Sequence, residues 1–212
     1  MVDGDLSDFD LRNVSEHLEK ALLEDGNVCL ENYILAWREL NKMFPLLSRL
    51  FSFVQSDVES KIEILDAYRV GEEREHFLTV HSMLAYEIRI ERTHATKPPS
   101  AARTLLRLHR ALEYLVRLIR DIHNSSDQDK MAPIAGCAYD ETLAKHHPWL
   151  IRKGVHLAVH TLANREEMIH SLSGHLGALD ADKAMHDVVT HGQTVYDRVQ
   201  RLYEEHDLLQ LP

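Results

Sequence analysis

The sequence predicts an all-α protein of 212 residues, because helix-breaking residues are scarce and apolar residues recur with helical spacing. Only eight Gly and six Pro occur, and long stretches contain neither. No segment alternates apolar and polar residues over the length of a strand. Apolar residues make up 44% of the chain and charged residues 27%, as in ordinary globular proteins, so we expect one domain over residues 1–212.

The first half of the chain predicts four helices. The first spans about 7–24 and stops at Gly26, and the second starts at Asn27 or Asn32 and ends or kinks at Pro45. Two more follow, and apolar residues recur along both. They span about 46–68 and 72–92.

The second half predicts three or four further helices. The paired prolines of THATKPPSAA make a connector, and Ser100 can cap a helix over about 100–123. A polar loop and a shorter helix to about Lys145 follow. The last two helices are expected at 149–173 and 180–206, separated by glycines.

Charge and motifs restrict the classes of function. The formal net charge of −10 argues against nucleic-acid binding, since phosphate neutralisation needs a basic surface. Three observations favour a cytoplasmic protein. The two cysteines lack a Cys-x-x-Cys spacing, the N-terminal segment does not resemble a signal peptide, and no run of eighteen apolar residues occurs. No nucleophile elbow, phosphate-binding loop or dinucleotide turn occurs, so we expect neither an enzyme nor a cofactor.

The segment RTLLRLHRALEYLVRLIR gathers basic residues on one side of an amphipathic helix. The stripe consists of Arg103, Arg107, Arg110 and Arg117. Such a stripe is either a solvated surface or a phosphate site, because guanidinium groups bind phosphate in a planar, bidentate manner. Arg103 and Arg107 lie one turn apart and can reach the same phosphate.

Two further segments allow both a plain and a functional interpretation. In SDVESK, Asp57 and Lys61 share a helix face, so they form either a surface ion pair or a polar site beside an apolar pocket. In HHPWLIRK, His147 and Trp149 stand at a helix boundary. The histidine can contact the last helical carbonyls or point into a cleft, and the tryptophan can cap the core or insert at a lipid interface.

Fifteen histidines raise a metal-binding alternative. Two Glu-x-x-His pairs, Glu73 with His76 and Glu167 with His170, would suit a di-iron carboxylate bundle if two other helices supplied glutamates. Chance pairs are common in a chain this rich in Glu and His, so no metal site is predicted.

The order of these segments resembles the glycolipid transfer protein superfamily, and within it the ceramide-1-phosphate transfer branch. FSFVQSDVESK, RTLLRLHRALEYL, HHPWLIRK and the closing LLQLP carry the resemblance, which spans about Leu30 to Pro212. The resemblance implies a two-layer all-α sandwich enclosing one lipid. It also implies that Asp57 and His147 bind the ceramide amide, that Lys61, Arg103 and Arg107 bind the phosphate, and that Trp149 docks at the membrane.

Two positions favour a phosphate over a sugar head group. Glycolipid-transferring members carry Asn where Lys61 stands and a sugar-stacking Trp where Arg103 stands, and a sugar would leave these cations without a partner. The branch has one more basic residue before the arginine helix. Arg92 is the better candidate for it and Lys97 the weaker one.

We therefore expect a cytoplasmic, monomeric, non-enzymatic carrier that contacts membranes transiently and moves ceramide-1-phosphate or a related sphingolipid phosphate. Its apolar sleeve is expected to draw on Phe44, Phe51, Phe53, Val54 and Leu106. The alternatives are a sensor that binds the same lipid, the di-metal bundle and a helical scaffold without a ligand.

Overall fold

The protein is all-α, as the sequence predicts. The computed structural model describes residues 9–47, 49–173 and 176–212, and none of them lies in a β-strand. They form ten α-helices: α1 Leu11–Ala21, α2 Leu30–Asn41, α3 Met43–Leu47, α4 Ser52–Val70, α5 Val80–Arg89, α6 Ala101–Asn124, α7 Met131–Glu141, α8 Trp149–Val159, α9 Arg165–Ser173 and α10 Ala178–Glu205. Three short 3-10 helices add η1 Arg49–Phe51, η2 Arg74–His76 and η3 Ala144–His146.

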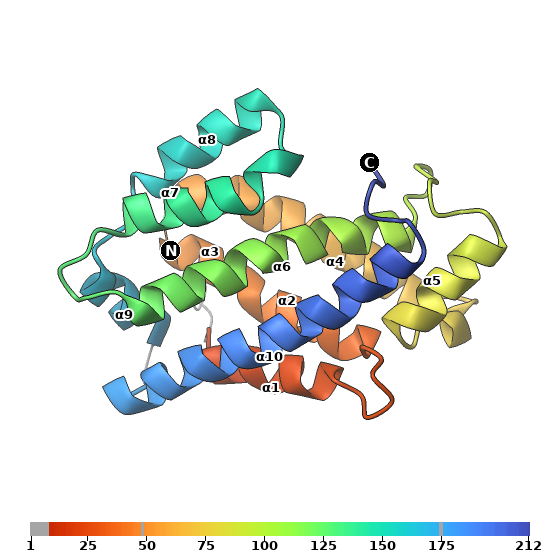
Figure 1. The fold of residues 1–212 in the computed structure, drawn as a ribbon, viewed down its shortest axis with the longest axis horizontal. Coiled ribbons are helices and arrows are strands. Elements are labelled where there is room, and N and C mark those ends of the chain that lie inside the picture. The colour runs from red at the N-terminus through yellow and green to blue at the C-terminus, as the bar shows by residue number, and fades with distance from the viewer. Residues whose placement is uncertain (1–8, 48, 174–175) are drawn as a thin grey trace, which may run out of the picture.

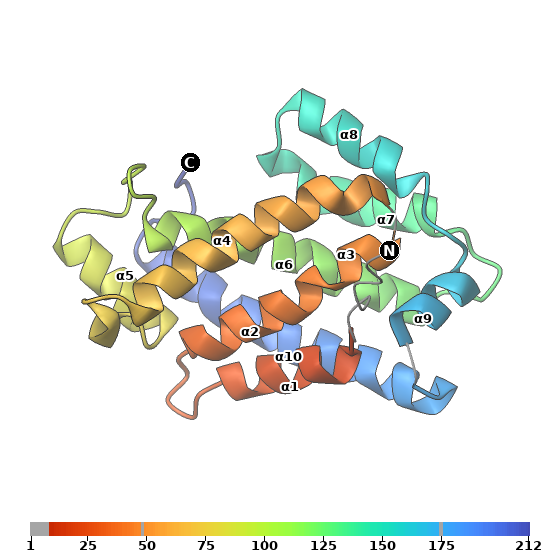
Figure 2. The same ribbon diagram turned by 180° about the vertical axis from the view of Figure 1, so that it is seen from behind.

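The long helices pack in two layers. Helices α6, α7 and α10 lie in front in Figure 1, and the opposite view in Figure 2 brings α1, α2 and α4 forward. Helix α6 runs through the middle of the molecule and packs against α10, α4 and α7. Its leucine-rich side is buried, so its arginine side faces the margin of the core.

Helix α6 is fixed at its start by two acceptors. The Ser100 hydroxyl accepts from the Arg103 backbone N–H at 3.0 Å, which confirms the predicted cap. The buried carboxylate of Glu87 accepts from the backbone N–H groups of Ala101 and Ala102 at 2.8 and 2.9 Å. These hydrogen bonds satisfy unpaired N–H donors of the first turn. They fix the position and orientation of α6 and therefore of the arginine stripe.

Helix α1 packs between α2 and α10. The Ser15 hydroxyl lies 3.1 Å from Nδ1 of His191, 176 residues away. Arg198 on α10 donates to the carbonyls of Leu23 and Asn27 at 2.8 and 3.1 Å. The first helix is therefore tied to the last.

The single helix predicted over 72–92 is wrong. The chain leaves α4 at Gly71, forms η2 and enters α5 only at Val80. Thr79 and Ser82 form a reciprocal capping box, which starts the helix there because it satisfies donors at its first turn.

The single helix predicted over 149–173 is also wrong, since α8 ends at Val159 and α9 starts at Arg165. The Asn164 side chain accepts from the Glu167 backbone N–H at 2.9 Å and so caps α9. The second helix was predicted to end or kink at Pro45, but α2 already ends at Asn41, and Pro45 lies within the short helix α3 between α2 and α4. Within the described residues, no helix is long and apolar enough to cross a membrane.

Candidate functional site

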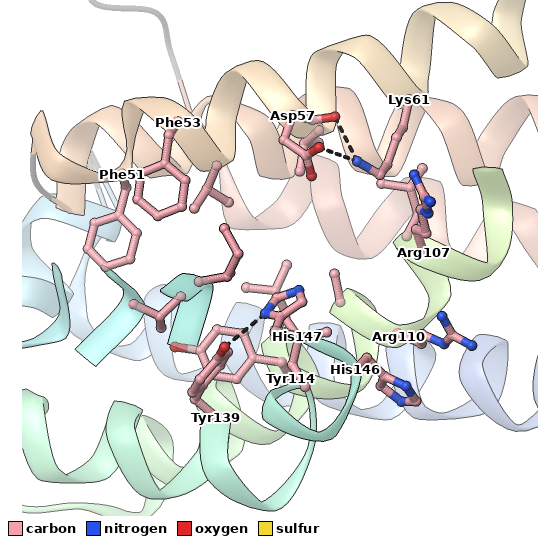
Figure 3. A pocket seen from close by; sticks show the side chains of 18 of the residues that line it. Phe51, Phe53, Asp57, Lys61, Arg107, Arg110, Tyr114, Tyr139, His146 and His147 are labelled. Atoms are coloured by element: carbon pink, nitrogen blue, oxygen red, sulfur yellow. Dashed lines mark hydrogen bonds and ion pairs between the residues drawn. The ribbon is translucent and has the colours of Figure 1, made fainter. Parts of the chain in front are cut away.

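A cavity of about 440 Å³ opens between α4, α6, α7 and α8. Its apolar part is lined by Phe44, Phe51, Phe53, Val54, Val58, Leu108, Ala111, Leu115, Leu143, Ile151 and Val155. Its polar part is lined by Asp57, Lys61, Arg107, Arg110, His146 and His147. Figure 3 shows the two phenylalanines of α4 and η1 at one end and the cationic groups at the other. Of the expected sleeve residues, Leu106 alone does not line the cavity; its side chain is buried in the core.

Asp57 and Lys61 form the ion pair that their spacing predicts. The carboxylate Oδ1 lies 2.5 Å from the Lys61 Nζ, which also donates to the Asp57 backbone carbonyl at 3.2 Å. The two partners differ in burial, because the Asp57 side chain is 68% exposed and the Lys61 side chain only 12%. A sheltered ammonium is thus neutralised by a carboxylate that stays accessible to a ligand.

Arg107 lines the same end of the cavity from α6. It is exposed, and no hydrogen bond or ion pair to another described residue engages its guanidinium. Lys61 on α4 lies at the same end of the cavity in Figure 3. The free guanidinium of Arg107 therefore offers donors to an anion that enters between α4 and α6.

Arg103 and Arg110 flank Arg107 and hold the segment after α10. The Arg103 Nε donates to the Pro212 carbonyl at 2.8 Å, and the Arg110 Nη2 donates to the carbonyls of Leu209 and Leu211 at 2.7 and 3.2 Å. Arg110 and Pro212 line the cavity, whereas Arg103 lies just outside it. Burial and the charge of Arg107 lower the pKa of Arg110 from its ordinary value.

The sequence placed Arg110 in the basic stripe without selecting it as a ligand. Its position three residues after Arg107, on the same side of the helix, was the available signal. The Arg117 guanidinium, by contrast, pairs with Asp121 and Glu141 at 2.7 and 2.6 Å, so that end of the stripe is an ordinary surface.

Arg92 and Lys97 lie outside the cavity lining. The Arg92 Nη2 donates to the Tyr68 hydroxyl at 3.4 Å, beside the connector that leads into α6. The structure therefore brings neither of these residues to the polar part of the cavity.

His147 enters the cavity from the turn between η3 and α8. Its Nδ1 lies 2.8 Å from the hydroxyl of Tyr139 on α7. Burial is the main cause that lowers its pKa, so the imidazole is neutral at pH 7. The neighbouring His146 also lines the cavity, and burial lowers its pKa to about 4.

Trp149 stands at the start of α8, with 63% of its surface exposed. It is not part of the cavity lining, but it follows His147 by two residues. Leu150, Ile151 and Leu157 on the same helix are exposed as well, beside Arg152 and Lys153. Helix α8 thus presents an apolar and basic surface at the cavity.

The two Glu-x-x-His pairs do not assemble a metal site. Glu73 accepts a hydrogen bond from Tyr86, and His76 stacks on the same ring at 4.0 Å. Glu167 and His170 lie on α9. Among the described residues, no group of three or more His, Cys, Asp or Glu is placed to hold a metal ion.

Comparisons with known proteins agree with this geometry. The family model described as Glycolipid transfer protein (GLTP) matches residues 28–174. The rat ceramide-1-phosphate transfer protein is 34% identical over 218 residues, which cover 100% of both chains.

Solved structures give the same result. A mouse ceramide-1-phosphate transfer protein in its apo form superimposes with a TM-score of 0.91 at 33% identity, covering 97% of this chain and 100% of that one. A human ceramide-1-phosphate transfer protein in complex with 12:0 ceramide-1-phosphate superimposes with a TM-score of 0.88 at 32% identity and the same coverage. With this match in sequence and fold, the chain belongs to the glycolipid transfer protein family.

Proposed function

We propose that this protein moves ceramide-1-phosphate between membranes without changing it chemically. The observation that carries the proposal is the composition of the cavity, whose apolar walls end in a cluster of cations with one carboxylate and two neutral imidazoles. That composition matches a lipid with two hydrocarbon chains, an amide and a phosphate. Relatives that share about a third of the sequence bear the name of the same activity.

The phosphate is assigned to Lys61 and Arg107, supported by Arg103 and Arg110. A phosphate monoester carries close to two negative charges and offers several acceptor oxygens, which guanidinium and ammonium donors match. An uncharged sugar would desolvate the same cations without neutralising them, which is unfavourable. The charge of this cluster thus favours a phosphate head group. Arg92, beside the connector, is proposed only as an outer contact.

The ceramide amide is assigned to Asp57 and His147. An amide offers one N–H donor and one carbonyl acceptor, so a carboxylate and an imidazole N–H suffice to fix it. When the phosphate takes over Lys61, the Asp57 carboxylate is released from its ion pair and can accept from the amide. The hydrocarbon chains then enter the apolar part of the cavity.

We infer a monomeric cytoplasmic carrier that touches a bilayer through Trp149 and needs no enzyme chemistry. The apolar and basic surface of α8 supports this docking, since such surfaces suit anionic lipid interfaces.

Transfer of labelled lipids between vesicles tests the function. Ceramide-1-phosphate, galactosylceramide and sphingomyelin are compared as donor lipids, and we expect that only the first moves. Binding of ceramide-1-phosphate without transfer would instead identify a sensor. Equal movement of galactosylceramide would contradict the assignment of the cations to a phosphate.

Replacing Trp149 with alanine is expected to weaken binding to anionic vesicles roughly tenfold, because a large exposed side chain loses its burial at the interface. Flotation with vesicles measures this binding. The affinity for a short-chain lipid in solution should stay unchanged, since Trp149 does not line the cavity.

Leu179→Ala is the control for this variant. Leu179 is 88% exposed and belongs to the first turn of α10. The start of α10 lies at the bottom of Figure 1, whereas α8 lies at the top. Equal loss of vesicle binding in both variants would show that α8 is not the docking surface.

A further inference from the structure

Tyr139 on α7 lines the cavity beside His147, and no part of the lipid has been assigned to it. It is 1% exposed, and its hydroxyl lies 2.8 Å from His147 Nδ1. Figure 3 marks this hydrogen bond with a dashed line. Its ring is fixed by two edge-on neighbours, Tyr114 at 6.0 Å and His156 at 5.8 Å between ring centroids. The hydroxyl therefore has a defined position relative to the imidazole.

The direction of this hydrogen bond follows from the partners available. Among the described residues, Nδ1 of His147 is the only acceptor within hydrogen-bond distance of the Tyr139 hydroxyl. A buried hydroxyl without an acceptor is unfavourable, so the phenol donates to Nδ1. Burial raises the pKa of Tyr139 to about 12, which keeps the phenol protonated.

The direction of the bond sets the chemistry of the other ring nitrogen. A neutral imidazole carries one proton, and an Nδ1 that accepts from Tyr139 leaves that proton on Nε2. An Nε2–H can donate to a carbonyl oxygen. The opposite tautomer would present a lone pair at Nε2, which repels a carbonyl and cannot bind it.

We propose that Tyr139 is a positioning residue that holds His147 in the tautomer protonated on Nε2, so that the imidazole presents a donor to the amide carbonyl of the lipid. This inference rests on the proposed function, because the amide is part of the ligand assigned there. It extends the recognition of the amide to a residue that does not touch the amide itself.

The tautomer is measured first, by nitrogen NMR of protein labelled with ¹⁵N-histidine and recorded without lipid. We expect the proton of His147 on Nε2, and a shift of the Nδ1 resonance in Tyr139→Phe as its donor is lost. A wild-type spectrum with the proton on Nδ1 would overturn the inference, whatever the lipid results.

Binding of short-chain ceramide-1-phosphate is measured next. Tyr139→Phe keeps the ring and should bind about tenfold more weakly, the effect of one lost hydrogen bond on the orientation of His147. Tyr196→Phe is the control, since Tyr196 stacks on His109 outside the cavity and should bind normally. Wild-type affinity in Tyr139→Phe would overturn the inference.

A double-mutant cycle separates positioning from a general structural effect. In a His147→Ala background, Tyr139→Phe should cause no further loss, because its effect passes through the imidazole. An equal tenfold loss in that background would assign Tyr139 a structural role and overturn the inference. Failure of the wild-type protein to bind the lipid would instead overturn the proposed function, and the tautomer spectrum would still decide the state of His147.

Discussion

Arg107→Leu is expected to reduce transfer of ceramide-1-phosphate about a hundredfold, which corresponds to about 3 kcal/mol of lost binding free energy. The reason is that Arg107 has no other described partner, so its guanidinium is the cation most available to the phosphate. Arg103 and Arg110 already donate hydrogen bonds to carbonyls of the segment after α10, so they replace Arg107 poorly. The vesicle assay measures the loss.

The fold should survive this change. Arg107 is exposed, so the free energy of unfolding should stay within about 0.5 kcal/mol of wild type in a denaturant titration. Arg120→Leu is the matched control on the same helix, since Arg120 donates to Gln193 away from the cavity. Full transfer by Arg107→Leu would show that the phosphate binds elsewhere.

Asp57→Val is expected to weaken binding of ceramide-1-phosphate roughly thirtyfold and to reduce its preference over phosphatidic acid. The variant lacks the carboxylate that accepts from the amide, a charged hydrogen bond of about 2 kcal/mol. Phosphatidic acid has no amide N–H, so it loses no hydrogen bond to this side chain. It also meets a Lys61 that is no longer neutralised by an ion pair.

Equilibrium binding of both lipids checks this change in selectivity. Glu63→Val is the matched control, because Glu63 is an exposed carboxylate on α4 outside the cavity. A parallel loss of affinity for both lipids in Asp57→Val would mean that Asp57 acts on the phosphate site in general and does not read the amide.

Sequence patterns predicted the parts of the molecule that short-range geometry determines. The ion pair of Asp57 and Lys61 follows from their spacing of four on a helix, and the cap at Ser100 follows from its place after the paired prolines. Both are local, so they need no knowledge of the rest of the fold. The starts of α5 at Thr79 and of α9 at Asn164 are also set by local capping bonds. They were missed because apolar residues recur with helical spacing on both sides of each break.

Other features depend on contacts between distant segments and could not be predicted in this way. Arg110 meets carbonyls 99 and 101 residues away, so no pattern within α6 shows that it is held in place at the cavity. The bond between Tyr139 and His147 crosses from α7 over η3 to a turn. Its geometry depends on how these elements pack.

The pairing of α1 with α10 has a consequence for how the molecule is made on the ribosome. Synthesis runs from the N-terminus, so α1 emerges before α10, and His191 follows its partner Ser15 by 176 residues. Until then the buried side of α1, with Leu11, Val14 and Leu18, lacks the cover that α10 supplies. Closure of the two layers is thus a late, long-range step, and nascent chains expose apolar surface of the kind that chaperones protect.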